Sequence, residues 1–309
     1  MKRISVVLSL ALGLGLTTGL ARDAAAQRHT IRSDARSRID TTVAFDRNGT
    51  VTVTAGNGDI LVTGSQAGTV HVRASSDNNN LQFESSPARM SIEITNRHGG
   101  DNRIELAVPI GVRVILRSQS GDISVRGTRG EIEAYAQSGD VLVEDATRLA
   151  VNTLSGGISA GAINGDVSIQ STSGDVKLSD VRGDVDVQTV SGDVDMRGVT
   201  AKVVRAKTTS GDVTYDGTID KAGRYDLSTN SGDVGLHIPR DASAQLTVST
   251  WNGEIQSDFP ITLRPGEHGI GSSNSKRLTF EINGGGARIS AETFSGDVTV
   301  SSNGRGARP

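Results

Sequence analysis

The sequence predicts an all-β solenoid, a single chain wound into stacked coils of short strands. Gly-Asp or a close variant recurs every nine residues from 121 to 192, apart from one step of 17. Later copies are spaced by 19 and 21 residues. An apolar-x-apolar triplet follows nearly every copy. Aromatic residues are only 3% of the 309 residues, so the core must consist of thin layers of Val, Ile and Leu.

The repeat has the form Ser-Gly-Asp-apolar-x-apolar, with a small or polar residue usually at x. Its apolar pairs are Ile123/Val125, Val141/Val143, Val167/Ile169, Val176/Leu178, Val185/Val187, Val194/Met196, Val213/Tyr215, Val234/Leu236 and Val298/Val300. A period of two with one apolar face predicts a half-buried strand. Such short strands bury a core only when coils stack. We therefore expect a single-stranded, β-helix-like solenoid of about nine or more rungs, each holding two strands and two turns in 18 to 21 residues.

Glycine and aspartate have mechanical roles at the predicted turns. Glycine adopts positive φ at a corner without steric cost, and aspartate can accept hydrogen bonds from backbone amides two residues on. The predicted turn residues are Gly121, Asp122, Gly139, Asp140, Gly165, Asp166, Gly174, Asp175, Gly183, Asp184, Gly192, Asp193, Gly211, Asp212, Gly232, Asp233, Gly296 and Asp297.

The first 26 residues have the pattern of a cleaved secretory signal peptide. Lys2 and Arg3 precede an apolar stretch over 4–20, and Ala24-Ala25-Ala26 supplies the small residues of a cleavage site. An uncleaved anchor is the alternative, but the stretch is short and interrupted by glycine. We expect an exported protein, periplasmic or extracellular.

The rest of the chain divides by pattern. Residues 27–44 are polar and Arg-rich and are predicted to be a leader or linker. The repeat domain is predicted over 45–302, with 45–118 as a less regular N-terminal part, and 303–309 as a flexible tail. A solenoid exposes sheet edges at both ends, and we expect 41–116 and 257–290 to cap them. The segment 145–152 is the least β-like and is predicted to be an irregular corner.

Composition excludes several classes of protein. The net charge of −3 gives no broad basic field for nucleic acid. The chain has no Cys, which excludes thiolate metal sites and a cysteine nucleophile. After the signal peptide no apolar stretch is long enough to span a bilayer, so the mature chain is predicted to have no transmembrane segment. No motif indicates a cofactor.

The sequence resembles the bacterial "putative adhesin" β-strand repeat family, exported proteins of unknown function. The resemblance covers residues 45–301. It rests on Leu106-Ala107-Val108-Pro109-Ile110-Gly111, on Ser-Gly-Asp followed by Ile or Val at 120, 138, 173 and 191, on His237-Ile238-Pro239 and on Thr293-Phe294-Ser295-Gly296-Asp297-Val298. The motif is specific for the fold. The family implies no catalytic residues, and its adhesin label is itself an inference from shape.

Stacked acids are the first candidate site. One 18-residue register aligns Asp122, Asp140, Asp175 and Asp193, and the other register aligns Glu131, Asp166 and Asp184. Calcium would relieve repulsion between them, and Asp175, Asp184 and Asp193 are the candidate ligands. Turn capping explains the same residues without an ion.

Three further patterns could support chemistry. Asp184, Asp186, Asp193 and Asp195 are predicted to lie outward and near one another, as glycan hydrolysis by paired carboxylates would need. Ser159 lies in a G-x-S-x-G sequence, but a strand rather than a helix is predicted to follow. Gly284-Gly285-Gly286 lacks the pattern of a phosphate loop and is predicted to be a turn.

These patterns favour a non-catalytic protein. We expect a rigid adhesin-like surface in the cell envelope, with an envelope protein or a glycan as its partner. Trp251 is a candidate anchor on that surface, whereas Tyr215 is predicted to pack inward. Two alternatives remain: an envelope enzyme that acts on polysaccharide, and a scaffold that self-associates.

Overall fold

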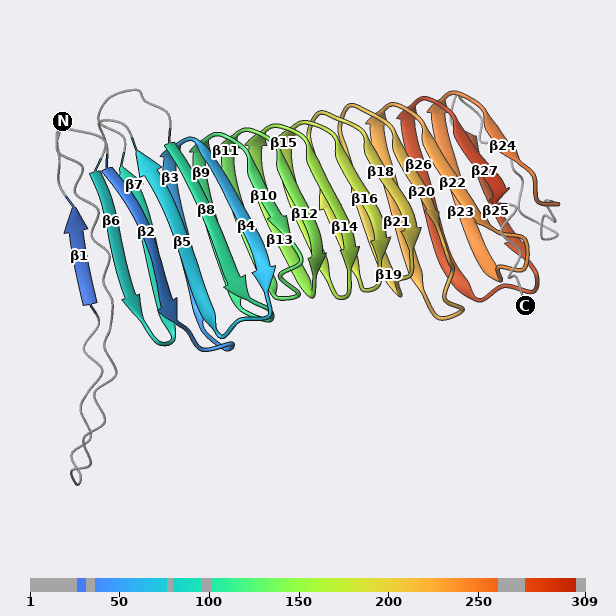
Figure 1. Cartoon of the computed structure of the whole chain (residues 1–309). Coiled ribbons are helices and arrows are strands. Elements are labelled where there is room, and N and C mark those ends of the chain that lie inside the picture. Colours follow the sequence, from blue (N-terminus) through green and yellow to red (C-terminus); the bar gives the residue numbers. More distant parts are fainter. Residues whose placement is uncertain (1–26, 32–36, 77–79, 96–101, 261–275, 304–309) are drawn as a thin grey trace.

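The computed structural model of the chain describes residues 27–31, 37–76, 80–95, 102–260 and 276–303. Two long sheets face each other in an elongated stack (Figure 1). None of the described residues forms a helix that could cross a membrane. The predicted all-β solenoid is confirmed, because each sheet is a ladder of short, mostly parallel strands.

The strands of each sheet follow a spatial order that departs from the chain order near both ends. In that spatial order, sheet A contains β1 (Gln27–Ile31), β6 (Asn80–Ser86), β7 (Arg89–Thr95), β3 (Thr50–Asn57), β9 (Arg113–Ser120), β11 (Glu131–Ser138), β13 (Arg148–Ser155), β15 (Val167–Ser173), β17 (Val185–Gln188), β19 (Val203–Lys207), β21 (Arg224–Ser231), β26 (Ala287–Ser295), β23 (Ala244–Asn252) and β25 (Lys276–Ile282). Sheet B contains β2 (Ser37–Ala44), β5 (Thr69–Ser76), β8 (Asn102–Pro109), β4 (Asp59–Ser65), β10 (Ile123–Arg126), β12 (Val141–Ala146), β14 (Ile158–Ile163), β16 (Val176–Val181), β18 (Val194–Val199), β20 (Val213–Gly217), β22 (Val234–Pro239), β27 (Val298–Asn303) and β24 (Ile255–Ser257).

One rung consists of a strand of sheet A and the next strand of sheet B, joined at a Gly-Asp corner. The rungs stack in register, so that Val176 pairs with Val194 and Val194 with Val213. The Ser-Gly-Asp-x-x-x repeat therefore places equivalent residues directly above one another, one sheet spacing of about 4.8 Å apart. The predicted rung length of 18 to 21 residues agrees with this register.

The core is a continuous layer between the two sheets. Inward positions of the repeat are buried along the whole stack, from Val51 in β3 to Val300 in β27. Because these side chains are small and β-branched, adjacent rungs pack like for like without large rings. Among the regular rungs, Tyr215 and Tyr225 are fully buried and meet edge to face, with 5.6 Å between ring centroids, and toward the two ends Phe83 and Phe280 are buried too. Burial raises the pKa of both phenols, and the inward packing predicted for Tyr215 is observed.

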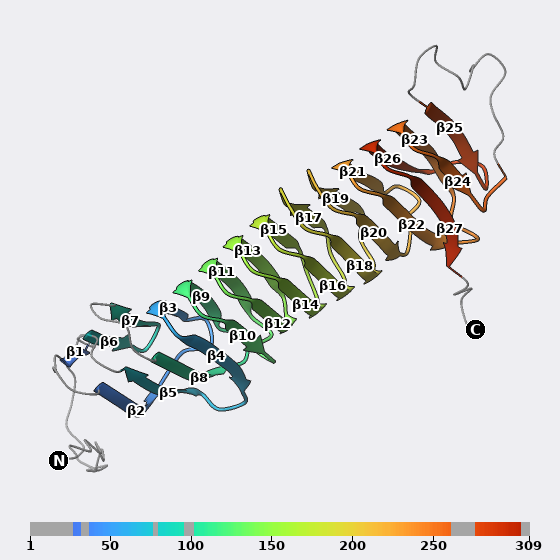
Figure 2. The ribbon, with the colours of Figure 1, turned by 90° about the horizontal axis from the view of Figure 1, so that it is seen from above.

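The chain does not add its rungs in sequence order at the two ends. Near the N-terminus, β3 lies between β7 and β9, and β4 lies between β8 and β10. Near the C-terminus, β26 and β27 enter the stack between β21/β22 and β23/β24 (Figure 2). Three of the four outermost pairings are antiparallel, namely β1 on β6, β2 on β5, and β25 on β23, whereas β24 pairs with β27 in parallel. The strands β24 and β25 cover the C-terminal end of the parallel ladder, as a cap must.

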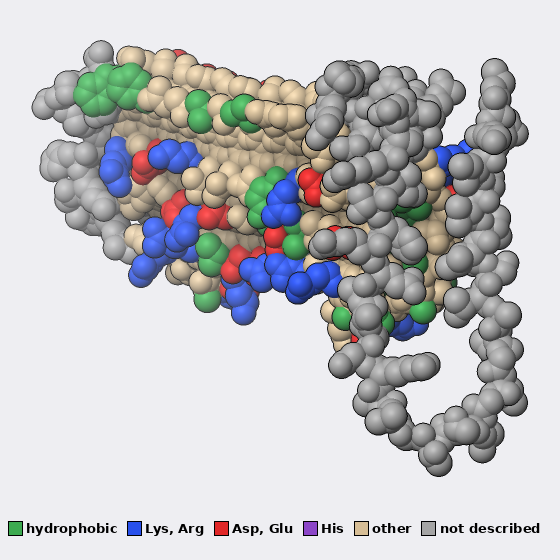
Figure 3. Space-filling view, turned by 90° about the vertical axis from the view of Figure 1, so that its left-hand side faces the viewer, with side chains coloured by type: hydrophobic (Ala, Val, Ile, Leu, Met, Phe, Trp, Pro, Cys, Tyr) green, Lys and Arg blue, Asp and Glu red, His purple; other side chains and the backbone are tan. Residues whose placement is uncertain are grey.

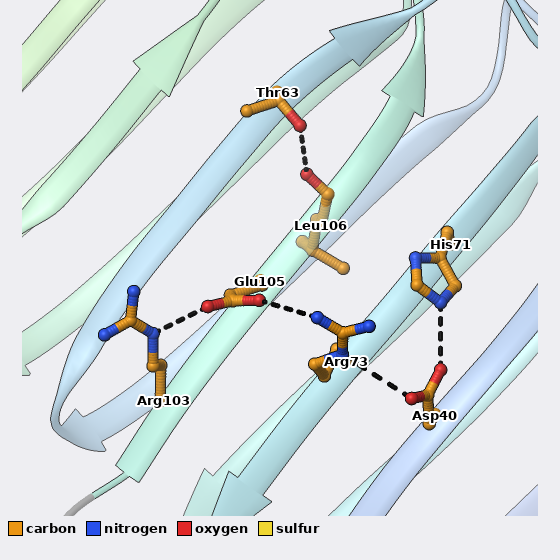
Figure 4. A network of polar contacts seen from close by, with 7 residues as sticks. All are labelled: Asp40, Thr63, His71, Arg73, Arg103, Glu105 and Leu106. Carbon is orange, nitrogen blue, oxygen red and sulfur yellow. Dashed lines mark hydrogen bonds and ion pairs between the residues drawn. The ribbon is translucent and has the colours of Figure 1, made fainter.

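A chain of polar contacts crosses the N-terminal strands of sheet B (Figure 4). The Asp40 carboxylate in β2 lies 2.9 Å from the His71 ring and 3.5 Å from the Arg73 guanidinium, both in β5. Glu105 in β8 then joins Arg73 to Arg103. The hydrogen bond from His71 holds the pKa of Asp40 below its usual value. These contacts link β2, β5 and β8, whose pairing is not determined by the Ser-Gly-Asp-apolar repeat.

Two expectations about segments are wrong. Residues 27–44 were predicted to carry no strand, but they contain β1 and β2, and Ile39 is buried against the core. Pairing with β5 and β6 overrides the polar composition. Residues 145–152 belong mostly to strands, because β12 extends to Ala146 and β13 begins at Arg148; Asp145, with a φ of 61°, is an irregular position within β12, and the bend is at Thr147. The predicted signal peptide and residues 304–309 of the tail lie outside the described residues.

Candidate functional site

The Gly-Asp corners form a hydrogen-bonded column along one edge of the stack. Most of the corner glycines have positive φ, for example 123° at Gly174 and 130° at Gly192. The aspartates differ from expectation, because their carboxylates do not bond amides two residues on. Asp175 Oδ1 accepts from the amide of Asp193 in the next rung, and Asp193 Oδ1 accepts from Asp212. In a parallel stack the corner amide of the next rung lies directly above each carboxylate, so the carboxylate accepts from that amide and not from one in its own rung.

The same bond runs through most of the stack. Its carboxylates are those of Asp59, Asp122, Asp140, Asp175, Asp193, Asp212, Asp233 and Asp297. The column is interrupted at Gly157. The amide of Gly157 donates to Asp140, but glycine has no carboxylate that could accept from the amide of Asp175 in the next rung. At the opposite corner, Asp166 and Asp184 accept from the amides of Asp184 and Val203 in the same way.

The acidic candidates do not converge. Asp175 and Asp193 lie in one column and Asp184 in the other, so the three calcium candidates do not face one another. Within the described parts of the chain, no group of three or more His, Asp or Glu side chains is placed to hold a metal ion. The amide bonds stabilise each stacked carboxylate, which was the role proposed for calcium.

The carboxylates considered for hydrolysis are also apart. Asp186 belongs to β17 in sheet A, whereas Asp195 belongs to β18 in sheet B. Their side chains project from opposite faces of the solenoid, because residues at both positions point away from the shared core. Asp195 instead pairs with Arg197, two residues along its own strand. The expected acidic cluster is therefore wrong.

The remaining sequence patterns have structural roles. Ser159 is an exposed residue within β14, and no helix follows it. Gly284, Gly285 and Gly286 all have positive φ and form the turn between β25 and β26. Neither place has the architecture of a nucleophile elbow or a phosphate loop.

A row of buried hydroxyls accompanies most corners of sheet A, with Ala55 and Ala136 at the equivalent position of two others. The repeat is longer than it first seems: Thr or Ser usually stands three residues before the glycine, as in Thr189-Val190-Ser191-Gly192-Asp193. Thr189 is buried and donates to the carbonyl of Ser191, and Thr208 donates to the carbonyls of Gly192 and Ser210. These bonds turn the chain out of the sheet, so that the residue after each hydroxyl is exposed. This Thr or Ser position is visible in the sequence, but it lies outside the shorter Ser-Gly-Asp motif.

The exposed residues on either side of these hydroxyls line a large hollow on sheet A, which we call the polar groove. Its volume is about 1050 Å³, and it crosses β7, β3, β9, β11, β13, β15, β17 and β19. Its face row is Thr54, Arg117, Tyr135, Asn152, Gln170, Gln188 and Lys207. Its edge row is Gly56, Gln119, Gln137, Leu154, Thr172, Val190 and Thr209, and its floor is made of Ala55, Ser118, Ala136, Thr153, Ser171 and Thr189.

The middle of the polar groove is uncharged. Asn152, Gln170 and Gln188 follow one another at rung spacing on adjacent strands. Charged side chains occur on either side of this middle: Glu93 on β7, Arg117, which lies 5.0 Å over the ring of Tyr135, and Lys207. A row of side-chain amides presents donors and acceptors together at a fixed interval. The arrangement can hold an extended polar ligand along the axis of the stack.

The edge row also carries exposed apolar side chains. Leu154 and Val190 are 52% and 53% exposed. Figure 3 shows hydrophobic side chains spaced along one upper edge, above a strip of uncharged surface. Trp251, which the sequence suggested as an anchor, is exposed in β23 and stacks on Phe294 in β26. The sequence did not reveal that the two are neighbours.

The sequence matches one known family. The Toastrack DUF4097 family matches residues 39–301. The chain belongs to this family. The Toastrack match begins within β2 and ends within β27, so it covers all the rungs between the caps, together with the C-terminal strands β24 and β25, whereas β1 lies outside it.

Two solved structures match this Toastrack chain at low sequence identity and low TM-score. One is "a putative cell adhesion protein" from Clostridium sporogenes, with a TM-score of 0.27 and 8% identity, covering 86% of this chain and 100% of that one. Another is "a putative adhesin" from Bacteroides fragilis, with a TM-score of 0.35 and 13% identity, covering 87% of this chain and 99% of that one. A search of curated proteins finds no match.

Proposed function

We propose that this protein is an exported, non-catalytic, adhesin-like module of the cell envelope, which binds an extended ligand in the polar groove. The observation that carries the proposal is the groove itself. It is open, runs across eight adjacent strands and is lined by mostly uncharged side chains, in which a row of amides lies beside apolar residues such as Leu154 and Val190. Stacked repeats are suited to such elongated surfaces because every rung offers the same site again.

The N-terminal sequence supports export. Lys2 and Arg3, the apolar stretch after them and Ala24-Ala25-Ala26 have the pattern of a signal peptide. The placement of carboxylates supports binding rather than hydrolysis. Glycosidases use two carboxyl groups on either side of one bond, whereas Glu93 is the one carboxylate among the described residues that line the groove.

Sedimentation tests the proposal. The purified exported protein is mixed with bacterial envelope fractions and the pelleted fraction is measured. We expect retention on at least one fraction, and about a tenfold weaker affinity for Thr172→Arg, which places a long charged side chain in the edge row. Ser159→Arg adds the same charge to the outer face of sheet B and serves as the matched control. Equal retention of both variants contradicts a role for the groove.

The same assay tests calcium. A chelator added to the mixture removes any ion held by Asp175, Asp184 or Asp193. Because these carboxylates bond backbone amides in the structure, we expect retention to be unchanged. Loss of retention with the chelator, restored by added calcium, would assign a metal to these corners.

A further inference from the structure

The edge row of the polar groove continues beyond the groove to an aromatic pair. The strand register places Asn230 of β21 after Thr209, then Phe294 of β26, then Trp251 of β23. Each of these residues occupies the same place in the repeat, between the buried Thr and the Ser or Asn of the corner. The pair is brought into line because β26 inserts between β21 and β23.

The rings of Trp251 and Phe294 are exposed and stack in nearly parallel planes, and we call the pair the Trp251–Phe294 platform. Their centroids are 5.9 Å apart and their planes differ by only 9°, an offset stack. Trp251 is 42% exposed and Phe294 is 51% exposed. Exposed aromatic surface is costly to leave in water. The chain has few aromatic residues and a single Trp, so the placement of two on one edge distinguishes this position from the other rungs.

We propose that the polar groove and the Trp251–Phe294 platform together bind a neutral polysaccharide chain. This rests on the function proposed above and names its ligand. Sugar hydroxyls are both donors and acceptors, and the amides of Asn152, Gln170 and Gln188 are matched to both. The C–H face of a pyranose carries partial positive charge and stacks on the negative face of an aromatic ring.

Charge argues against a polyanion. The three central face-row residues are amides, and the edge row has no charged member from Gln119 to Thr209. A sulfated or uronic acid polymer would need a cation at frequent intervals to offset its charge. The strands β11, β13, β15 and β17 separate Arg117 from Lys207. These two cations therefore do not provide the closely spaced positive charge that a polyanion would need.

Backbone pairing argues against an extended peptide. A peptide that adds to a sheet needs an edge strand with unpaired N–H and C=O groups. The sheet A strands from β9 to β19 are each paired with a neighbour on both sides, and the groove crosses them instead of following an edge. The groove offers side chains alone, at one interval per rung, which suits a polymer with regularly repeated hydroxyls.

The single Trp makes the test direct. Soluble neutral oligosaccharides of increasing length, derived from cellulose, chitin, mannan and starch, are titrated against the full exported protein while its tryptophan emission is recorded. We expect at least one series to shift the emission of Trp251, with affinity that rises with chain length. Polygalacturonate and a mixed extended peptide should give no shift.

Variants then locate the binding. Gln170→Ala with Gln188→Ala should weaken the glycan by about tenfold or more, and Trp251→Ala by a similar factor measured by calorimetry. Trp251→Phe retains the stack and should retain most of the affinity. Lys177→Ala, exposed on β16 of sheet B, is the control and should bind like the native chain. Far-UV circular dichroism checks that each variant is folded.

The outcomes separate the two proposals. Retention on envelope fractions that is abolished by protease treatment of those fractions, with no emission shift by any neutral oligosaccharide, overturns the glycan inference and leaves a protein ligand. A response to polygalacturonate alone overturns it as well. Failure to sediment with any fraction removes the proposed function itself.

Discussion

The middle of this solenoid and its two ends are built by different rules. From β9 to β22 the order of strands in space is their order in the chain, and each rung pairs with the one just completed. At the N-terminal end, the inner strands β3 and β4 precede in sequence the strands β5 to β8 that lie outside them. At the C-terminal end, the outer strands β23 and β24 come first, and β26 and β27 fill the inner position later. The middle can therefore grow from local contacts, whereas each end requires strands distant in sequence to meet.

This difference matters for stability. A repeat in the middle gains the same interface on both sides, and the energy of the stack is close to a sum over neighbours. An end rung has one neighbour and an exposed edge. Insertion of the last rung between two earlier ones ties the C-terminal cap to the stack on both sides, because β26 pairs with β21 and with β23. The contrast can be tested by substitutions in the middle and at the ends, from the largest expected effect to the smallest.

The largest effect is expected at a central corner. Gly192 has a φ of 130°, and a Cβ there would overlap the carbonyl of Gly174 in the rung below. Gly192→Ala should destabilise the protein by about 3 kcal/mol or more, from backbone strain and the forced separation of two rungs. Guanidinium unfolding measures it. Gly111→Ala, with a φ of 95° and no neighbouring atoms, should cost only about 1–2 kcal/mol. Equal losses would show that close stacking is unimportant.

The next effect is expected where the regular rungs approach the C-terminal cap. The Tyr225 hydroxyl donates to the carbonyl of Ala201 and accepts from the amide of Asp220, at 2.7 and 2.9 Å. Tyr225→Phe leaves both groups without this partner in the protein interior, so we expect a loss of about 1–3 kcal/mol in the free energy of unfolding. Tyr135→Phe, on the exposed face, is the control. A loss no larger than in that control would mean that water replaces the hydroxyl.

A smaller effect is expected from repair of the interrupted aspartate column. A Cβ at Gly157 would make ordinary contacts with its neighbours. Gly157→Asn would supply the missing acceptor for the amide of Asp175 without adding charge. It should stabilise the protein by roughly 0.5–1.5 kcal/mol beyond Gly157→Ala, which reports only the loss of chain freedom. Asp193→Ala should remove a similar amount. Urea unfolding compares the native chain with the three variants, and an Asn variant no better than Ala contradicts the column's contribution.

The smallest effect is expected in the N-terminal cap. The pKa of Asp40 is lowered in the folded protein, chiefly by its hydrogen bond with His71. Its contribution is therefore complete above its unfolded pKa, near 3.8, and is lost as the pH falls through the lower, folded value. Asp40→Asn should reduce the melting temperature slightly at pH values well above the unfolded pKa and be indistinguishable from the native chain in strong acid. A difference that persists undiminished in strong acid would contradict this assignment.

The sequence was sufficient for most of the repeat. Alternation at Val194 and Met196 predicted inward strand residues, and Gly-Asp spacing predicted the corners and the rung length, because both depend on neighbouring residues alone. The polar composition of 27–44 was misleading: Ile39 lies in an edge strand that forms only because β5 is available to pair with it. The partner of each carboxylate was also missed, since it belongs to the next rung.

The sequence by itself determined the two-residue period, the turn chemistry, the thin aliphatic core and the single Trp as an anchor candidate. The tertiary structure decided which rungs lie side by side. Only stacking could bring Asn152, Gln170 and Gln188 into one row, place Asp186 and Asp195 on opposite faces, and set Phe294 against Trp251 from a different part of the chain. The physical reason is that a repeat specifies the shape of a rung, whereas the order of rungs at the ends depends on which open edge the chain reaches and covers.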